Sequence, residues 1–264
     1  YMLWRILQAH GGTLPDGVKV IFANTGKEMQ ETLSFVDECA LHWKVPITWV
    51  EYRYLDGHHT FAVVNWHLAS RQGEPFAQVI QHRRMLPNPR VRFCTVELKV
   101  QTMHRYLKSV GWTEWDSIIG IRADEPRRVA KLGNQDYGSH ETRVAPLATA
   151  GIVAADVGAF WMAQPFDLRL PNMNGKTMHG NCDLCFLKGG DQIQSLIREQ
   201  PSRALWWMKQ ETYAAETFVE RYTGGAFKFR LDRPSYAAMH RNATNQDEMF
   251  PFDDEPLQDC MCTD

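Results

Sequence analysis

The hydrophobic positions along the chain follow two patterns, continuous runs and helical spacing. Together they predict alternating strands and helices. Continuous apolar, β-branched runs have the length of buried parallel strands at residues 18–23, 45–52 and 117–122. Apolar residues at helical spacing predict helices at residues 1–10, 31–43, 76–86, 94–110, 156–164, 191–199 and 202–222. This alternation, with short glycine-bearing turns, is typical of an α/β fold in which helices flank both faces of a parallel sheet.

The chain is expected to form a single domain, residues 1–264, with two parts. Residues 1–170 carry the predicted strands, and residues 171–264 form a helical, cysteine-bearing C-terminal part. Neither an internal repeat nor a low-complexity linker divides the sequence. Ser202 is the expected N-cap of the long C-terminal helix, Gly224-Gly225 its expected stop, and the tail from Asn245 is expected to be extended.

Composition and charge narrow the class of protein. A chain of 264 residues with 44% hydrophobic residues can bury a sizeable core, and a formal net charge of −2 gives no general attraction to nucleic acid. No apolar run approaches the roughly 20 residues that span a bilayer, and no secretory signal opens the sequence, so we expect a cytoplasmic protein. The helix at Tyr1 has no capping residue before it, so we expect that a preceding segment is missing.

Cysteines supply the clearest candidate chemistry. The candidate metal ligands lie in three places: Cys94, the pair Cys182 and Cys185, and the pair Cys260 and Cys262. A Cys-x-x-Cys turn can direct two sulfurs to one metal or cluster, and the basic neighbour Arg92 favours a thiolate at Cys94. We therefore predict a buried iron–sulfur or zinc site, with Cys39 in the core. The alternative is that Cys94 is a small buried hydrophobic residue and that the terminal pair has no role.

Two loops follow predicted strands at the edge where open α/β sheets bind ligands. The first loop is Asn24-Thr25-Gly26-Lys27-Glu28, directly before a helix whose N-terminal N–H groups can hold an anion. The second carries Arg122, Glu125, Arg127 and Arg128, and arginine suits phosphate or sulfate through bidentate hydrogen bonds. Together they indicate a nucleotide pocket. The alternatives are a simple turn that needs glycine and a solvated charged loop.

Three motifs carry a family resemblance. Residues 20–28, Val-Ile-Phe-Ala-Asn-Thr-Gly-Lys-Glu, are followed by Glu31-Thr32, and residues 119–128 read Ile-Gly-Ile-Arg-Ala-Asp-Glu-Pro-Arg-Arg. Pro146-Leu147 then precedes Asp156-Val157 and Phe160-Trp161. In this order, over most of residues 18–185, the motifs resemble those of the phosphoadenosine phosphosulfate reductase family. The family's second motif has a serine where this chain has Pro126.

The resemblance implies a PP-loop fold of the adenine nucleotide alpha hydrolase type, with residues 1–170 as a core that binds ATP or phosphoadenosine phosphosulfate. It implies nucleotide-binding residues at Asn24, Thr25, Gly26, Glu28, Arg122, Glu125 and Arg128. The chain looks closest to phage and bacterial relatives with extra cysteines, because it lacks the Glu-Cys-Gly-Ile-His tail of the assimilatory reductase. The family's phosphate loop, Ser-Gly-Gly-x-x-Ser, does not occur here, and truncation before Tyr1 is the expected reason.

We therefore expect an adenine-nucleotide-dependent enzyme of sulfur chemistry, similar to phosphoadenosine phosphosulfate reductase, whose catalytic residue stays unassigned. Its expected cofactor is a [4Fe-4S] cluster beside the nucleotide pocket, held by Cys94, Cys182, Cys185 and either Cys260 or Cys262. A thioredoxin-like electron donor and a second copy of the chain are candidate partners. Three alternatives stay open: an ATP-dependent sulfur transferase that acts on a nucleic acid, a nucleotide-binding enzyme without a cluster, and a non-catalytic interaction module that holds zinc.

Overall fold

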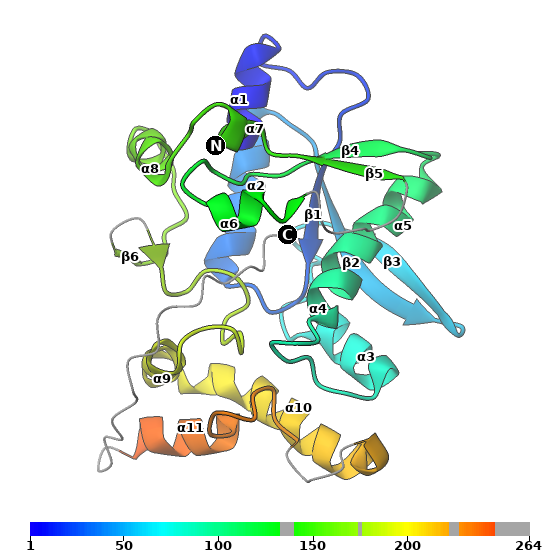
Figure 1. Ribbon diagram of the computed structural model, residues 1–264, viewed down its shortest axis with the longest axis vertical. Coiled ribbons are helices and arrows are strands. Elements are labelled where there is room, and N and C mark those ends of the chain that lie inside the picture. Colours follow the sequence, from blue (N-terminus) through cyan, green and yellow to red (C-terminus); the bar gives the residue numbers. More distant parts are fainter. Residues whose placement is uncertain (133–139, 174–175, 222–226, 246–264) are drawn as a thin grey trace.

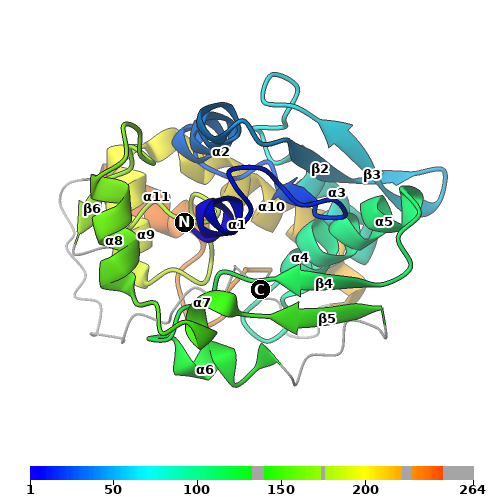
Figure 2. The same ribbon diagram turned by 90° about the horizontal axis from the view of Figure 1, so that it is seen from above.

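The computed structural model describes residues 1–132, 140–173, 176–221 and 227–245, and these form a mixed α/β fold with small sheets (Figures 1 and 2). The strands pair as β1 (Val20–Asn24), β2 (Ile47–Leu55) and β3 (His58–Val64), as β4 (Trp115–Ile118) with β5 (Glu141–Val144), and as β6 (Asn172–Met173) with β7 (Lys176–Thr177). The α-helices are α1 (Met2–Ala9), α2 (Gln30–Trp43), α3 (Glu74–Arg83), α4 (Phe93–Thr95), α5 (Gln101–Ser109), α6 (Pro126–Val129), α7 (Pro146–Thr149), α8 (Ala154–Met162), α9 (Gly190–Glu199), α10 (Ala204–Thr217) and α11 (Tyr236–Thr244).

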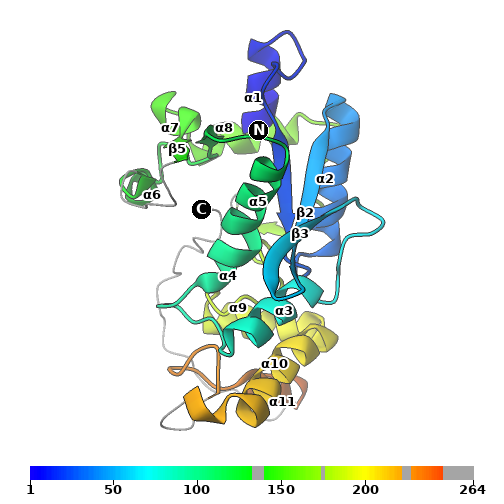
Figure 3. The same cartoon turned by 90° about the vertical axis from the view of Figure 1, so that its right-hand side faces the viewer.

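The sheet β1-β2-β3 positions the first candidate loop. β1 and β2 are parallel, and α2 is the crossover that parallel neighbours require. Leu33 of α2 shares an apolar cluster with Trp49 of β2, whereas Leu107 of α5 shares a second cluster with Val50. Because adjacent strand residues point to opposite faces, α2 and α5 cover opposite faces of this sheet, as Figure 3 shows.

The antiparallel strand β3 is absent from the sequence-based prediction, although the chain carries its signal. Asp56 and Gly57 join β2 to β3, and both have positive φ angles, of 51° and 80°. An Asp-Gly pair with two positive φ values is typical of the tight turn that joins two strands of a hairpin. The Asp-Gly turn therefore indicates a hairpin, and with it the strand β3, in the sequence.

The predicted parallel sheet is present only in part. β1 pairs with β2 and β4 pairs with β5, both in parallel, but β1 and β4 are not paired with each other in the described part of the chain. The predicted strand at residues 117–122 ends at Ile118 instead. The Ile121 amide donates to the Ile119 carbonyl at 2.9 Å across Gly120, which turns the chain toward α6.

The predicted helix at residues 94–110 is helical throughout but changes pitch. A π-helical turn, Val96–Val100, separates α4 from α5. Thr102 Oγ1 donates to the Glu97 carbonyl at 2.7 Å, a bond that spans five residues and supports the wider turn. The carboxylate of Glu97 is buried on this turn, which no periodicity of apolar residues could have indicated.

Residues 171–264 carry α9, α10 and α11 beside the short strands β6 and β7, and they share a core with the first sheet. The largest apolar cluster contains Tyr52 of β2, Phe76 of α3 and Trp207 of α10, so it crosses the predicted boundary at residue 170. The N-cap prediction for Ser202 is wrong, because a 3-10 turn, Pro201–Arg203, precedes α10 and no side chain caps it. Gly224-Gly225 and the tail after Asn245 lie outside the described residues.

In the described ranges we find no helix that is both long and apolar enough to cross a membrane.

Glu211 of α10 gives the C-terminal helices a pH dependence. Its carboxylate accepts hydrogen bonds from the amides of Phe229 at 3.3 Å and Tyr236 at 2.8 Å, but burial dominates and raises its pKa to about 7. The folded protein therefore binds a proton more tightly than the unfolded chain, and this stabilisation is lost as the pH rises from about 4.5 to about 7.

We predict that Glu211→Gln flattens the stability profile. The wild-type free energy of unfolding should fall between pH 5 and pH 8 by up to about 3 kcal/mol more than that of the variant, because a pKa shift of one unit corresponds to about 1.4 kcal/mol. Urea unfolding followed by tryptophan fluorescence measures both profiles. Parallel profiles for the two proteins would contradict the assignment.

Candidate functional site

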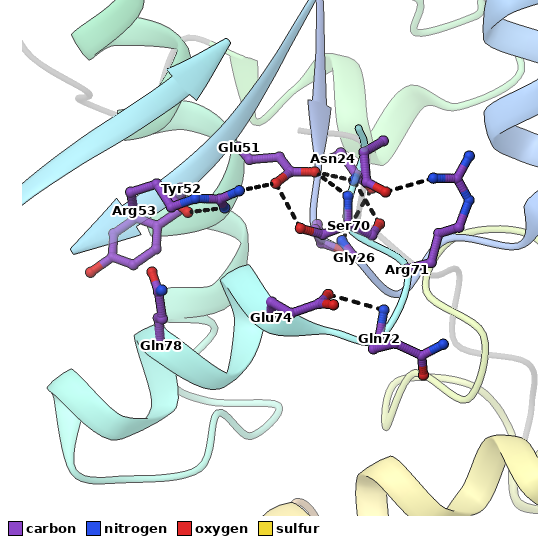
Figure 4. Close-up of polar contacts among 12 residues, drawn as sticks. Asn24, Gly26, Glu51, Tyr52, Arg53, Ser70, Arg71, Gln72, Glu74 and Gln78 are labelled. Atoms are coloured by element: carbon purple, nitrogen blue, oxygen red, sulfur yellow. Dashed lines mark hydrogen bonds and ion pairs between the residues drawn. The ribbon is translucent and has the colours of Figure 1, made fainter. Parts of the chain in front are cut away.

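The first candidate loop begins at Asn24, the last residue of β1, whose side chain is fully buried (Figure 4). Its Nδ2 donates to Glu51 Oε1 at 2.6 Å and to the Ser70 carbonyl at 2.9 Å. Its Oδ1 accepts the Gly26 amide at 3.1 Å, which bends the chain as it leaves the strand. Asn24 therefore uses its whole amide group to shape the loop.

Glu51 of β2 anchors this arrangement from the neighbouring strand. It lies opposite Asn24 in the parallel register and is completely buried. Ser70 donates to it twice, through its amide at 2.6 Å and its hydroxyl at 2.8 Å, and Arg53 pairs with it at 2.6 Å. Four donors therefore converge on one buried carboxylate, so Glu51 ties β2, the Ser70 segment and the loop together.

Thr25 and Glu28 close the loop on itself. The Thr25 amide donates to Glu28 Oε2 at 3.0 Å, a bond like that of a capping box, and the Thr25 hydroxyl donates to Glu28 Oε1 at 2.8 Å. Gly26 between them has φ +78°, and a Cβ there would lie 3.0 Å from Pro75 Cδ and 3.1 Å from Gly73 Cα. The close approach of the loop to the start of α3 thus requires glycine.

The Cys-x-x-Cys turn lies directly against this loop. Cys182 forms an isolated antiparallel bridge with Glu28, and the Asp183 amide donates to the Lys27 carbonyl at 2.8 Å. Thr25 Oγ1 is 3.6 Å from Cys182 Sγ. Two segments that are more than 150 residues apart in sequence therefore meet, with a thiol at the end of β1.

Asp183, inside the Cys-x-x-Cys turn, holds the arrangement together. Its carboxylate pairs with Lys27 Nζ at 2.9 Å, and the two side chains are only 2% and 6% exposed. Trp207 Nε1 of α10 donates to it at 2.9 Å, and Arg203 lies 3.6 Å away. The ammonium of Lys27 also lies 4.9 Å from the ring centre of Trp206, as a cation–π contact. Loop, turn and helix α10 thus meet at one buried ion pair.

The second candidate loop forms its own cluster after β4. Glu125 accepts the Arg122 amide at 3.0 Å and pairs with Arg128 at 2.6 Å, while Arg122 Nε pairs with Asp124 at 2.9 Å. Burial would raise the pKa of Glu125, but these hydrogen bonds outweigh burial and lower its pKa. The Arg122 side chain is about one third exposed and is held by its neighbours. Figures 2 and 3 show α6, at the end of this loop, apart from β1.

The structure therefore groups the predicted residues in two sets. Asn24, Thr25, Gly26 and Glu28 bond to β2, to the segment before α3 and to Cys182. Arg122, Glu125 and Arg128 bond among themselves. The side chains of the first set are committed to internal bonds, so a ligand at this loop would meet backbone groups.

The described cysteines lie in two environments. Cys94 packs against the same apolar cluster that contains Cys182 and Cys185, whereas Cys39 is buried on α2, as predicted, where burial raises its pKa to about 12. None of these four forms a disulfide with another described cysteine.

The structure does not assemble the predicted metal site from its described residues. No group of three His, Cys, Asp or Glu side chains among the described residues is placed to hold a metal ion. Cys260 and Cys262, the other predicted ligands, lie outside the described residues. The cluster stays a prediction.

Sequence reasoning missed three residues that build the site: Lys27, Asp183 and Glu51. Lys27 and Asp183 stand inside motifs already singled out, but a charged residue beside a glycine or between two cysteines is usually solvated. Glu51 was the more readable case, because it interrupts the apolar strand 45–52, where an unpaired charge is costly.

The chain is similar to one curated protein, the uncharacterized nin region protein ORF290 of Escherichia phage lambda, with 28% identity over 207 residues. The match covers 76% of this chain and 66% of that protein, so the chain spans about two thirds of the relative's length. No protein-family model matches the chain, and no solved structure matches it.

We predict that Lys27 and Asp183 are energetically coupled. Lys27→Met or Asp183→Asn alone leaves a buried charge without its partner and should cost about 3–5 kcal/mol. The double variant should cost less than the sum of the two by about 1–3 kcal/mol. Urea unfolding of the four proteins gives the cycle, and Lys209→Met, an exposed change on α10, is the control that should stay within about 0.5 kcal/mol. Additive costs would show that the pair does not join the segments.

Proposed function

We propose that this protein is an adenine-nucleotide-dependent enzyme of sulfur chemistry, similar to phosphoadenosine phosphosulfate reductase. The observation that carries the proposal is the position of the Cys182–Cys185 turn. It lies on the loop at the carboxyl end of β1, with Cys182 Sγ 3.6 Å from Thr25 Oγ1. Ligands of parallel α/β sheets bind beyond this edge, so a nucleotide held there would lie near two thiols.

The two loops suggest a division of labour in nucleotide binding. Backbone groups of Asn24, Thr25 and Gly26 would hold the adenosine, because their side chains are used within the fold. Arg122 and Arg128 would hold phosphate or sulfate, since Glu125 already orients both of them. The parallel pairs β1-β2 and β4-β5 support the further proposal that the chain has a PP-loop type of sheet.

Cys182 and Cys185 are the proposed centre of the sulfur chemistry. Both thiols are buried, and the Cys185 amide donates to the Cys182 carbonyl at 3.3 Å, which keeps the turn tight. A cluster or a zinc ion, if bound, would take thiolates here and would supply electron transfer or a purely structural link, respectively. The proposal itself needs only that the thiols and the nucleotide share one edge of the sheet.

We predict that Arg122 contributes to nucleotide affinity and that Arg127 does not. Loss of a charge-assisted hydrogen bond costs roughly 1.5–3 kcal/mol, so Arg122→Ala should weaken phosphoadenosine phosphosulfate binding about tenfold or more. Arg127→Ala is the matched control, because Arg127 is an exposed arginine of the same loop. Isothermal titration with phosphoadenosine phosphosulfate, ATP and GTP measures all three proteins.

Two results would reject the nucleotide proposal. One is the absence of binding of either adenine nucleotide to the wild-type protein. The other is an equal loss of affinity in Arg122→Ala and Arg127→Ala, which would mean that the arginine loop acts only through its overall charge.

A further inference from the structure

A cationic segment stands out against the nearly neutral chain. Residues 82–108 contain seven Lys and Arg and a single acidic residue, whereas the whole chain has 29 Lys and Arg against 31 Asp and Glu. The segment runs from the end of α3 through α4 and the π-helical turn to α5. Figure 3 shows these helices along one side of the molecule, beside the β2–β3 hairpin. This segment therefore carries a local excess of positive charge that the net charge of the whole chain, −2, does not reveal.

Its one acidic residue, Glu97, holds two of the arginines in place, and Glu220, from outside the segment, lies 3.5 Å from Arg84. The buried Glu97 carboxylate accepts hydrogen bonds from Arg83 and, at 3.2 Å, from Arg105. Their side chains remain 44% and 23% exposed. Arg105 also lies 6.0 Å from the ring centre of Tyr52. Two arginine side chains are thus held in place while part of each side chain stays exposed, which reduces the entropy lost when they bind an anion.

Aromatic rings lie next to these arginines. The exposed His82 ring packs on Tyr54 with centroids 4.2 Å apart, and it meets the His59 ring edge-on at 4.4 Å. Burial lowers the pKa of His59, and the nearby arginines act in the same direction. Proteins that bind single-stranded nucleic acids combine cations, which hold the phosphates, with aromatic rings, on which the bases stack.

We propose that this region, the arginine face, binds single-stranded nucleic acid; it consists of His82, Arg83, Arg84, Arg90, Arg105 and Lys108. An acidic protein would satisfy the charges but would make no use of the ring stack, so the face fits nucleic acid better. The proposal stands on charge and rings alone and does not depend on the nucleotide site. If both hold, the face would present a nucleic-acid acceptor to the sulfur chemistry.

The test compares two variants that lose equal charge. One replaces Arg84, Arg90 and Lys108 of the arginine face by Ala, and the matched control replaces Arg5, Lys19 and Arg198, which are exposed elsewhere on the surface. Fluorescence anisotropy of a labelled 20-nucleotide single-stranded DNA is measured from 50 to 200 mM salt. Each phosphate contact contributes about 0.7 to the slope of log K against log salt, so the face variant should lose about 2 from this slope and the control almost nothing.

Three results would overturn the proposal: equal losses in both variants, tighter binding of a duplex of the same sequence, or equal competition by poly-glutamate. The last result would assign the face to an acidic protein partner instead. Thermal melts of both variants establish that they fold. Titration of the face variant with phosphoadenosine phosphosulfate separates this proposal from the nucleotide site, because nucleotide affinity should stay at the wild-type value.

Discussion

The buried ion pair between Lys27 and Asp183 is the interaction on which the rest of the site depends. Two charges removed from water cost several kcal/mol each unless their remaining hydrogen-bonding capacity is filled. Here the carboxylate also accepts Trp207 Nε1 and the Leu184 amide, and the ammonium lies over the Trp206 ring. The pair is therefore stable only when the strand-end loop, the Cys-x-x-Cys turn and α10 are all in place.

Because of this dependence, the strand-end loop and the Cys-x-x-Cys turn are linked. A change at the loop after β1 must reach Cys182 and Asp183, because the Lys27 carbonyl and the Thr25 hydroxyl contact that turn directly. The segment before α3 packs closely against this loop, since the Gly73 amide donates to the Gly26 carbonyl at 2.9 Å and a Cβ at Gly73 would lie 2.4 Å from Trp206 Nε1. Binding at the carboxyl end of β1 is thus expected to alter the surroundings of the thiols, and this coupling is the central claim of the proposed function.

The spacing of apolar residues predicted individual strands and helices. It could not predict the features that depend on contacts between distant parts of the chain. The apolar runs placed β1 and β2, and the helical spacing placed α2, because each depends on neighbours in sequence. The same reasoning extended the third strand past Ile118 and missed the π-helical turn at Glu97. The strand end depends on a backbone turn across Gly120 and the π-helical turn on the Thr102 hydroxyl, and periodicity indicates neither. The candidate loop and the Cys-x-x-Cys turn were found separately. The expected cluster placed the cysteines beside the pocket, but the Lys27–Asp183 pair that joins the two segments was not predicted, because its residues carry no sequence signal for contact.

The measurement that tests the central claim most directly is the rate at which each cysteine is alkylated, with and without phosphoadenosine phosphosulfate. Peptide mass spectrometry after timed exposure to iodoacetamide resolves Cys182 and Cys185 from Cys39, which lies in the core of α2 and serves as the internal reference. Saturating nucleotide should change the rates at Cys182 and Cys185 severalfold and leave Cys39 unchanged. If nucleotide changes the alkylation rate of neither Cys182 nor Cys185, the result would contradict the account.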